Sequence, residues 1–168
     1  HYGNYEDFYK SNVESLKYII SLCKEFNIKL YHISTTSISG DGADLSLLNK
    51  KKTKKQILLN ESSLYTGQII NNVYAYSKFE AEINLLDAIT KGLNAYILRM
   101  GNLMPRYSDG LFQKNIQNNA FTNKITSFMK IEMVPDYLLK KDLEFTPVDC
   151  AANAIYKVIT NSTEINRI

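Results

Sequence analysis

The residues best suited to chemistry are a tyrosine and a lysine four positions apart. In the segment NNVYAYSKFEAE, Tyr74 and Lys78 are expected to share one face of a helix, about one turn from each other. A phenol with a pKa of about 10 donates its proton poorly at neutral pH, and a nearby ammonium is expected to lower that pKa. The pair therefore predicts proton donation to a substrate carbonyl, and the lysine can also hold a ribose hydroxyl.

The spacing alone is weak support, because Tyr137 and Lys141 repeat it. Context favours Tyr74. Its helix follows a predicted strand over residues 28 to 34 that runs into the hydroxyl-rich stretch STTS. In doubly wound sheets the chemistry takes place at the carboxyl ends of the strands. We therefore expect a threonine of this stretch to lie beside the same carbonyl as the phenol.

Two helix–strand units must position these groups. Asn4 is expected to cap a helix that runs to about Phe26, where apolar residues recur at three- and four-residue spacing. The strand over 28 to 34 follows it. A second helix from about Val73 to Lys91 is followed by a buried strand, Ala95–Met100. This order predicts an α/β fold with parallel strands, a partial Rossmann-like, doubly wound sheet.

The rest of the chain predicts a small C-terminal helical portion on the substrate side. Residues 110 to 131 have a helical pattern with a break near residues 118 and 119, and a loop follows. The segment LEFTPVD predicts a short strand that enters a helix. At the start of that helix we expect Thr146 as the cap, Pro147 in the first turn and Asp149 where the helix dipole favours a carboxylate.

Composition fits one globular domain over residues 1–168, since 45% of the residues are hydrophobic and 22% are charged. No apolar run approaches the roughly 18 residues that span a membrane, and the first residues do not resemble a signal peptide, so a cytoplasmic protein is expected. The net charge of +3 does not indicate nucleic-acid binding. No spacing predicts a metal site, and Cys23 and Cys150 are expected to be buried reduced thiols.

Two further features are expected to be structural. His32 lies inside a predicted strand and is interpreted as a core histidine rather than a catalytic base. The five lysines between Lys50 and Lys55 are interpreted as a solvated loop, with contact to an acidic carrier domain as the alternative.

Four motifs occur in an order that resembles one enzyme family. The segments NVESLKYII, YHISTTSISG, NNVYAYSKFEAE and LRMGNLMPR resemble the extended short-chain dehydrogenases/reductases. Within them, GNLMPRYSDGLFQKNIQNNAF and FTPVDCAANAI look like the thioester reductase domains of nonribosomal peptide and polyketide synthetases. The resemblance implies NADPH-dependent reduction of a carrier-protein-bound, phosphopantetheine-linked acyl or peptidyl thioester, released as an aldehyde or an alcohol.

The resemblance also implies roles for single residues. Tyr74 would be the proton donor, Lys78 its partner and a ligand of the cofactor ribose, and Thr35 the hydroxyl that orients the carbonyl, with Thr36 as the fallback. Asn12 matches the asparagine of an Asn-Val-x-Gly-Thr helix, although Glu-Ser replaces Gly-Thr here, and its role is structural or proton-relaying. Two positions are expected near the nicotinamide and the substrate, namely Met100 and Asn102. Asn102 and Arg99 have the alternative of simply bracing the strand end.

One departure from the family pattern affects cofactor binding. A Gly-x-x-Gly-x-x-Gly phosphate turn is not found among the seven glycines. Without the backbone donors of that turn, we expect these 168 residues alone to bind NADPH poorly and to be inactive. The alternatives are a nucleotide-sugar epimerase or dehydratase, a fatty acyl reductase, or a degenerate, non-catalytic interaction module.

Overall fold

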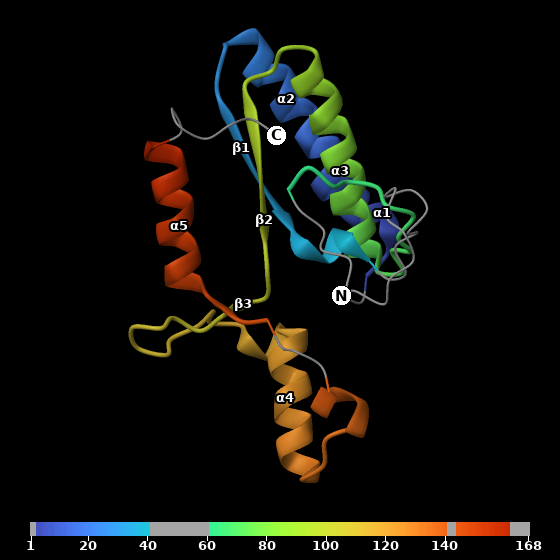
Figure 1. The fold of residues 1–168 in the computed structure, drawn as a ribbon, viewed down its shortest axis with the longest axis vertical. Helices are drawn as coiled ribbons and strands as arrows, with labels where there is room; N and C mark the ends of the chain where they lie inside the picture. Colours follow the sequence, from blue (N-terminus) through green and yellow to red (C-terminus); the bar gives the residue numbers. More distant parts are fainter. Residues whose placement is uncertain (1–2, 41–60, 141–143, 162–168) are drawn as a thin grey trace, which may run out of the picture. The chain divides into compact units, whose positions relative to one another are not determined.

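The computed structural model describes residues 3–40, 61–140 and 144–161, and the lysine cluster Lys50 to Lys55 lies outside them. The chain forms two compact units, one up to Met100 and one from Gly101 onward. Each unit contains its own pair of parallel strands (Figure 1).

The first unit begins with a helical segment that contains a π turn. Helix α1 (Tyr5–Tyr9) continues into a π-helix (Lys10–Glu14) and then α2 (Ser15–Glu25). The side chain of Asn4 accepts a hydrogen bond from the Glu6 amide at 3.2 Å, so the predicted cap is confirmed. The sequence predicted the helix but not the π turn, a feature that is frequent at functional sites.

The central strands of this unit are parallel neighbours, as predicted. Strand β1 (Leu30–Thr35) pairs with β2 (Ala95–Met100) from Leu30 opposite Ala95 to Thr35 opposite Met100. The bounds of β2 match the prediction, whereas β1 starts two residues later than residue 28. A 3₁₀ helix, η2 (Thr36–Ser39), follows β1 directly.

Helix α3 (Val73–Thr90) carries the Tyr74 and Lys78 pair. Asn72 caps it by accepting from the amides of Tyr74, at 2.9 Å, and Ala75, at 3.3 Å. Since the cap satisfies amides of the first turn, the helix starts at a fixed residue, and Tyr74 lies in that first turn.

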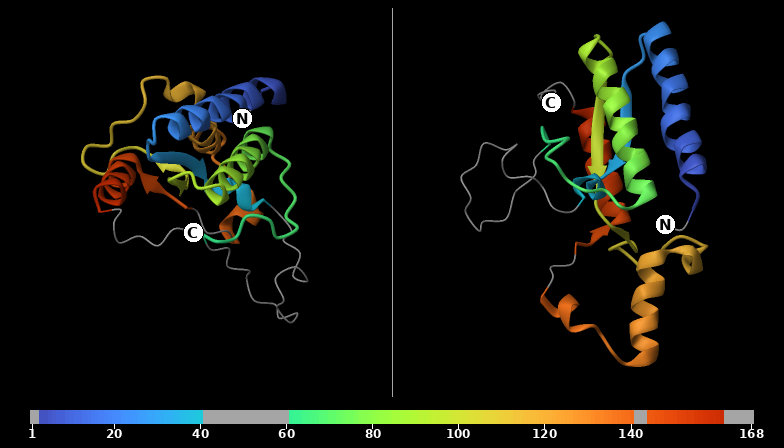
Figure 2. Two further views of the ribbon diagram at one scale, coloured as in Figure 1. Left: turned by 90° about the horizontal axis from the view of Figure 1, so that it is seen from above. Right: turned by 90° about the vertical axis from the view of Figure 1, so that its right-hand side faces the viewer.

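Helices α2 and α3 pack side by side (Figure 2), and their facing residues form the core of the unit. Leu85 and Ala81 of α3 are fully buried there, and Val13 and Leu16 are nearly so. Leu30 of β1 and Ile97 of β2 pack against this core. The core therefore joins α3 to the sheet and holds the helix along the two strands.

The second unit differs from the prediction at several points. Residues 110 to 115 are not helical, and helix α4 begins only after Asn119, whose side chain accepts from the Thr122 amide at 2.9 Å. Pro147, not Thr146, occupies the cap position of the last helix, because Thr146 is used in a short strand. The elements are β3 (Leu103–Met104), η3 (Ile116–Asn118), α4 (Ala120–Ile131), η4 (Asp136–Lys140), β4 (Thr146–Pro147) and α5 (Val148–Thr160).

The two cysteines differ in environment. Cys23 is a buried free thiol in the core, as predicted, whereas Cys150 is exposed in the first turn of α5, so its predicted burial is wrong. The helical pattern correctly placed Cys150 in a helix but assigned it to the buried face instead of the exposed one. Among the described residues, no helix is both long and apolar enough to cross a membrane.

Candidate active site

Tyr74 is half-buried in the first turn of α3. Its ring meets Phe8 of α1 edge to face, with 5.9 Å between the ring centroids. Burial raises the pKa of the phenol. This corrects the expectation that Lys78 lowers it, because desolvation of the phenolate has the larger effect here. The phenol is therefore protonated at neutral pH, which is the state that a proton donor needs.

Lys78 connects α3 to the carboxyl end of β1. Its Nζ donates to the carbonyl oxygen of Ile33 at 3.1 Å. Burial lowers the pKa of the ammonium, while the carboxylate of Glu82 acts in the opposite direction. One donated hydrogen bond leaves an ammonium with further N–H groups for other acceptors, such as the hydroxyls of a ribose.

Thr35 ends β1 and is buried, whereas Thr36 is exposed. The hydroxyl oxygen of Thr35 accepts from the Ser37 amide at 3.1 Å and so caps η2. Accepting this bond leaves the hydroxyl proton for donation. Met100, the predicted neighbour of the nicotinamide, lies opposite Thr35 in the β1–β2 register. The two strand ends thus bring Thr35 and Met100 together, with Lys78 bound two residues earlier on β1.

Asn12 lies in the π turn and holds it against α3. Its side-chain amide donates to the hydroxyl of Ser77 at 2.9 Å, and that hydroxyl donates to the Tyr74 carbonyl at 2.8 Å. Ser77 is fully buried. The contacts of Asn12 are those of a residue that positions the first turn of α3, which carries Tyr74.

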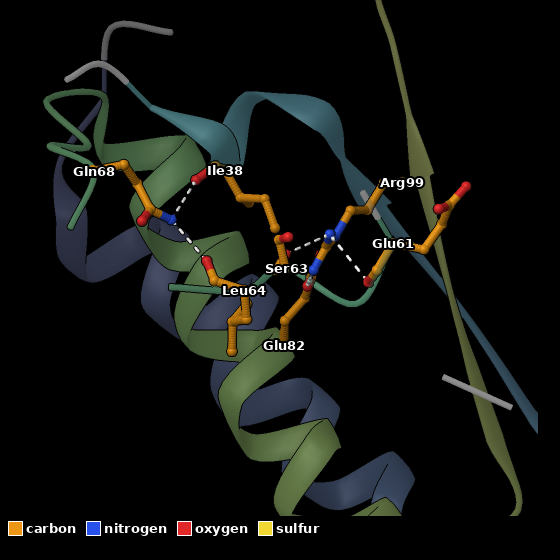
Figure 3. Close-up of polar contacts among 7 residues, drawn as sticks. All are labelled: Ile38, Glu61, Ser63, Leu64, Gln68, Glu82 and Arg99. Carbon is orange, nitrogen blue, oxygen red and sulfur yellow. Dashed lines mark hydrogen bonds and ion pairs between the residues drawn. The ribbon is translucent and has the colours of Figure 1, made fainter. Parts of the chain in front are cut away.

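A buried ion pair, which the sequence reasoning missed, lies one turn beyond Lys78. Glu82 is fully buried, and its carboxylate accepts from Arg99 of β2 at 3.1 Å from Nε to each oxygen and at 2.7 Å from Nη2. The Nη1 atom of Arg99 donates to the carbonyls of Ser63, at 2.9 Å, and Glu61, at 3.5 Å (Figure 3). The spacing of Glu82 four residues after Lys78 indicates that the two share a face of α3, but nothing local in the sequence indicates the pairing with Arg99, 17 residues further on.

The buried side chain of Gln68 fixes the segment before α3. Its amide nitrogen donates to the carbonyls of Leu64, at 2.7 Å, and Ile38, at 3.2 Å, as Figure 3 shows. Its oxygen accepts from the Thr66 amide at 2.6 Å. Because Ile38 belongs to η2, Gln68 and Arg99 together anchor residues 61–68 to the turn after Thr35 and to α3.

Two polar groups of β1 lie buried on the strand. Neither Nε2 of His32 nor Oγ of Ser34 has a hydrogen-bond partner among the described residues. Burial, and after it the charge of Lys78, lowers the pKa of His32 to about 4. The imidazole is therefore neutral near pH 7, in keeping with the interpretation of His32 as a structural residue rather than a base.

Asn102 belongs to the second unit and supports its local structure. Its carbonyl accepts from the Thr146 amide at 2.9 Å, and its side-chain amide donates to the Glu144 carbonyl at 3.5 Å. These contacts are those expected of a residue that braces the strand end. Arg99 in the first unit braces its strand in the same sense, through Glu82.

Asp149 secures the loop that follows β3. One oxygen accepts from the amides of Tyr107, at 2.9 Å, and Cys150, at 3.0 Å, and the other accepts from the Ser108 amide at 3.1 Å. These N–H groups lower the pKa of the carboxyl to about 2. The predicted position of Asp149 in the first turn of α5 is confirmed.

We expect Asp149→Asn to loosen this loop at neutral pH, because an amide accepts from backbone N–H groups less strongly than a carboxylate does. Amide exchange measured by NMR should accelerate at Tyr107 and Ser108. A depressed pKa means that the stabilisation is present above the ordinary value of 3.8 and is lost as the pH falls toward about 2. The wild type should therefore loosen only in that range, and Asp87→Asn should leave the loop unchanged. Equal exchange in Asp149→Asn and the wild type would contradict this role.

The comparisons with known proteins bear on this arrangement. A family model described as male sterility protein, of the NAD-binding type, matches residues 1–155. The chain belongs to this family. The search of curated proteins found no match.

Three solved structures similar to this member of the male sterility family contain reductase domains. A thiolation-reductase di-domain from an archaeal non-ribosomal peptide synthetase is 35% identical, with a TM-score of 0.73 over 86% of this chain and 37% of its own. The reductase domain of the aureusimine biosynthetic cluster is 25% identical, with a TM-score of 0.78 over 91% of this chain and 39% of its own. The terminal R domain of the myxalamid PKS-NRPS pathway, at 24% identity, a TM-score of 0.72 and coverage of 98% and 38%, shows the same fold.

These matches confirm the predicted α/β, Rossmann-like fold class and the place of the chain among the extended short-chain reductases of the thioester reductase type. The chain spans 37% to 39% of the length of these solved structures.

Proposed function

We propose that the protein containing this chain reduces a carrier-bound acyl or peptidyl thioester with NADPH and releases an aldehyde or an alcohol. The observation that carries the proposal is the position of Lys78. Its ammonium binds the Ile33 carbonyl at the carboxyl end of β1, one turn along α3 from Tyr74. The 35% identity to a thiolation-reductase di-domain supports the substrate class.

In this proposal Tyr74 is the general acid and Thr35 orients the substrate carbonyl. When bound, NADPH would supply a hydride to the thioester carbonyl carbon. The Tyr74 hydroxyl gives its proton to the carbonyl oxygen, which yields a hemithioacetal. The carbon–sulfur bond then breaks as the hemithioacetal hydroxyl loses its proton and the sulfur gains one, which releases the aldehyde and the free thiol. A protonated phenol is the form required for this step, and burial of Tyr74 favours that form.

Four residues are proposed to hold or face the cofactor. Lys78 can donate to ribose hydroxyls with the N–H groups that its bond to Ile33 leaves, and Tyr74 lies beside it on α3. Met100 ends β2 opposite Thr35, where a nicotinamide would lie in a sheet of this type. Asn102 is proposed on the family pattern alone. Asn12 is proposed to position the turn of Tyr74 rather than to touch the cofactor.

The proposed partner is a carrier domain that presents its substrate on a phosphopantetheine arm. Its thioester must reach the carboxyl ends of β1 and β2, since that is where Thr35 and Lys78 lie. One of the similar solved structures is a thiolation-reductase di-domain, so in that protein a thiolation domain and a reductase domain belong together.

The test is a product assay with the full-length protein. It is incubated with NADPH and an acyl-phosphopantetheine thioester, and aldehyde, alcohol and free thiol are measured together with NADPH consumption. We expect aldehyde or alcohol in amounts that equal the free thiol. Reduction of a free acyl-coenzyme A alone would indicate a fatty acyl reductase. Turnover only of a nucleotide sugar would indicate an epimerase or dehydratase, and no turnover of any of these would indicate a non-catalytic module.

A further inference from the structure

A buried carboxylate lies on the face of α3 that carries Tyr74 and Lys78. Tyr74, Lys78 and Glu82 follow one another at intervals of four residues, so they lie along the same face of the helix. Glu82 is fully buried, and both of its oxygens accept from the guanidinium of Arg99. A bidentate arginine is the partner that keeps a buried carboxylate ionised. The negative charge of Glu82 is thus fixed one turn from Lys78.

Lys78 needs such a charge because its surroundings disfavour the ammonium. Burial lowers its pKa, and Glu82 is the charged group that raises it. Among the described residues, the other titratable groups on the neighbouring elements include His32 on β1, Tyr74 on α3 and Arg99 on β2. His32 is neutral near pH 7, Tyr74 is protonated, and Arg99 is positive. Within the described part of the chain, the stabilising charge for Lys78 therefore comes from Glu82.

Arg99 links this charge to the rest of the site. While two of its nitrogens bind Glu82, the third donates to the Ser63 carbonyl at 2.9 Å. Ser63 belongs to the segment that Gln68 anchors to Ile38, in the turn directly after Thr35. The guanidinium of Arg99 thus holds both the Glu82 carboxylate and the segment around Ser63, which is anchored to the turn that follows Thr35.

We infer that Glu82, held by Arg99, is a positioning residue that keeps Lys78 protonated and in place for the reaction. As an electrostatic statement about Lys78 it stands by itself, and as a statement about catalysis it rests on the proposed function. Glu82 lies one turn beyond Lys78 on α3 and two turns beyond Tyr74, the proposed general acid. Its effect is expected through the ionisation of Lys78.

The test compares Glu82→Gln with Glu80→Gln in the full-length protein. Both changes remove one negative charge from α3, but Glu80 lies on another side of the helix and accepts from the Tyr5 hydroxyl. We expect Glu82→Gln to move the alkaline limb of the pH profile of kcat/KM to lower pH, with a loss of roughly tenfold on that limb. Glu80→Gln should leave the profile unchanged. Equal profiles for the two variants would overturn the inference.

A second readout does not depend on activity. The ionisation of Lys78 is followed by NMR of protein labelled in its lysine side chains, with the resonance assigned through Lys78→Arg. We expect the Lys78 titration to move to lower pH in Glu82→Gln and to return toward the wild-type position in Glu82→Asp. An unmoved titration would refute the inference, even if activity falls.

The two readouts also separate the inference from the proposed function. If the wild type reduces no thioester but the Lys78 titration moves as expected, the proposed function fails and the role of Glu82 stands. If the wild type is active and the Lys78 titration does not move in Glu82→Gln, the proposed function stands and the role of Glu82 fails. Should Glu82→Gln not fold, Arg99→Lys provides the second variant. It keeps the positive charge but loses the bidentate geometry, and we expect a smaller shift in the same direction.

Discussion

Replacement of Tyr74 with phenylalanine is expected to lower single-turnover NADPH oxidation by about 10² to 10⁴-fold, because it removes the proposed general acid. The ring that packs against Phe8 remains, so the fold of α1 and α3 should be unchanged. Cofactor affinity should change little, since the lysine that is proposed to bind the ribose is intact. The measurement uses the full-length protein with an acyl-phosphopantetheine thioester, together with a cofactor titration.

Two tyrosines serve as controls for this change. Tyr76 lies on the same helix, is exposed and has its ring tilted against that of Tyr5, and Tyr137 begins the second Tyr-x-x-x-Lys match. Tyr76→Phe and Tyr137→Phe should each leave turnover near the wild-type value. Unchanged turnover in Tyr74→Phe, or an equal loss in Tyr76→Phe, would rule out the proposed mechanism.

The pH dependence gives a further check on the same residue. Burial raises the pKa of Tyr74, so its proton is retained to higher pH than that of an exposed tyrosine. Any loss of activity between neutral pH and the ordinary tyrosine range should therefore come from Lys78, whose pKa burial lowers. For this reason the effect of Glu82→Gln is measured on the alkaline limb of the pH profile of kcat/KM.

The sequence predicted the elements better than the contacts between them. Strand Ala95–Met100, helix α3 and the cap at Asn4 could be found because they depend on neighbours within a few residues, through apolar spacing and capping chemistry. The parallel pairing followed from the order of the elements. The helix predicted over residues 110 to 115 does not form, because helical spacing without a cap or a partner surface does not make a helix.

For the candidate site, the sequence predicted which elements carry the residues but not the contacts that these residues make. Tyr74, Lys78 and Thr35 lie on the elements that the motifs indicated, but their catalytic roles stay predictions. The ion pair of Glu82 with Arg99 was missed because Arg99 has its partners 17 to 38 residues away, a distance over which local periodicity carries no information. The direction of the pKa of Tyr74 was wrong for a similar reason, since burial depends on tertiary packing.

The largest expected effect on stability comes from Arg99→Met. It leaves the carboxylate of Glu82, which is fully buried, without its cation, and it also removes the donor to Ser63. Breaking a buried pair by removing one partner costs about 3 to 5 kcal/mol, because the remaining charge has lost its solvation and gained nothing in return. The free energy of local unfolding is measured by native-state hydrogen exchange of the α3 amides, which reports on the first unit alone.

Lys91→Met is the control, because it breaks an ion pair of the same nitrogen–oxygen distance that is exposed instead of buried. The pairs Lys91–Asp87 and Arg99–Glu82 both have a nitrogen–oxygen distance of 2.7 Å, yet the side chains of the first are 63% and 60% exposed and those of the second 20% and 0%. An exposed pair at this spacing is worth about 0.3 to 0.5 kcal/mol, so Lys91→Met should cost little. The double change Arg99→Met with Glu82→Leu should recover most of the loss, since no buried charge then remains. If both single changes cost the same, or if the double change recovers nothing, then burial of the Glu82 charge is not what makes Arg99 necessary.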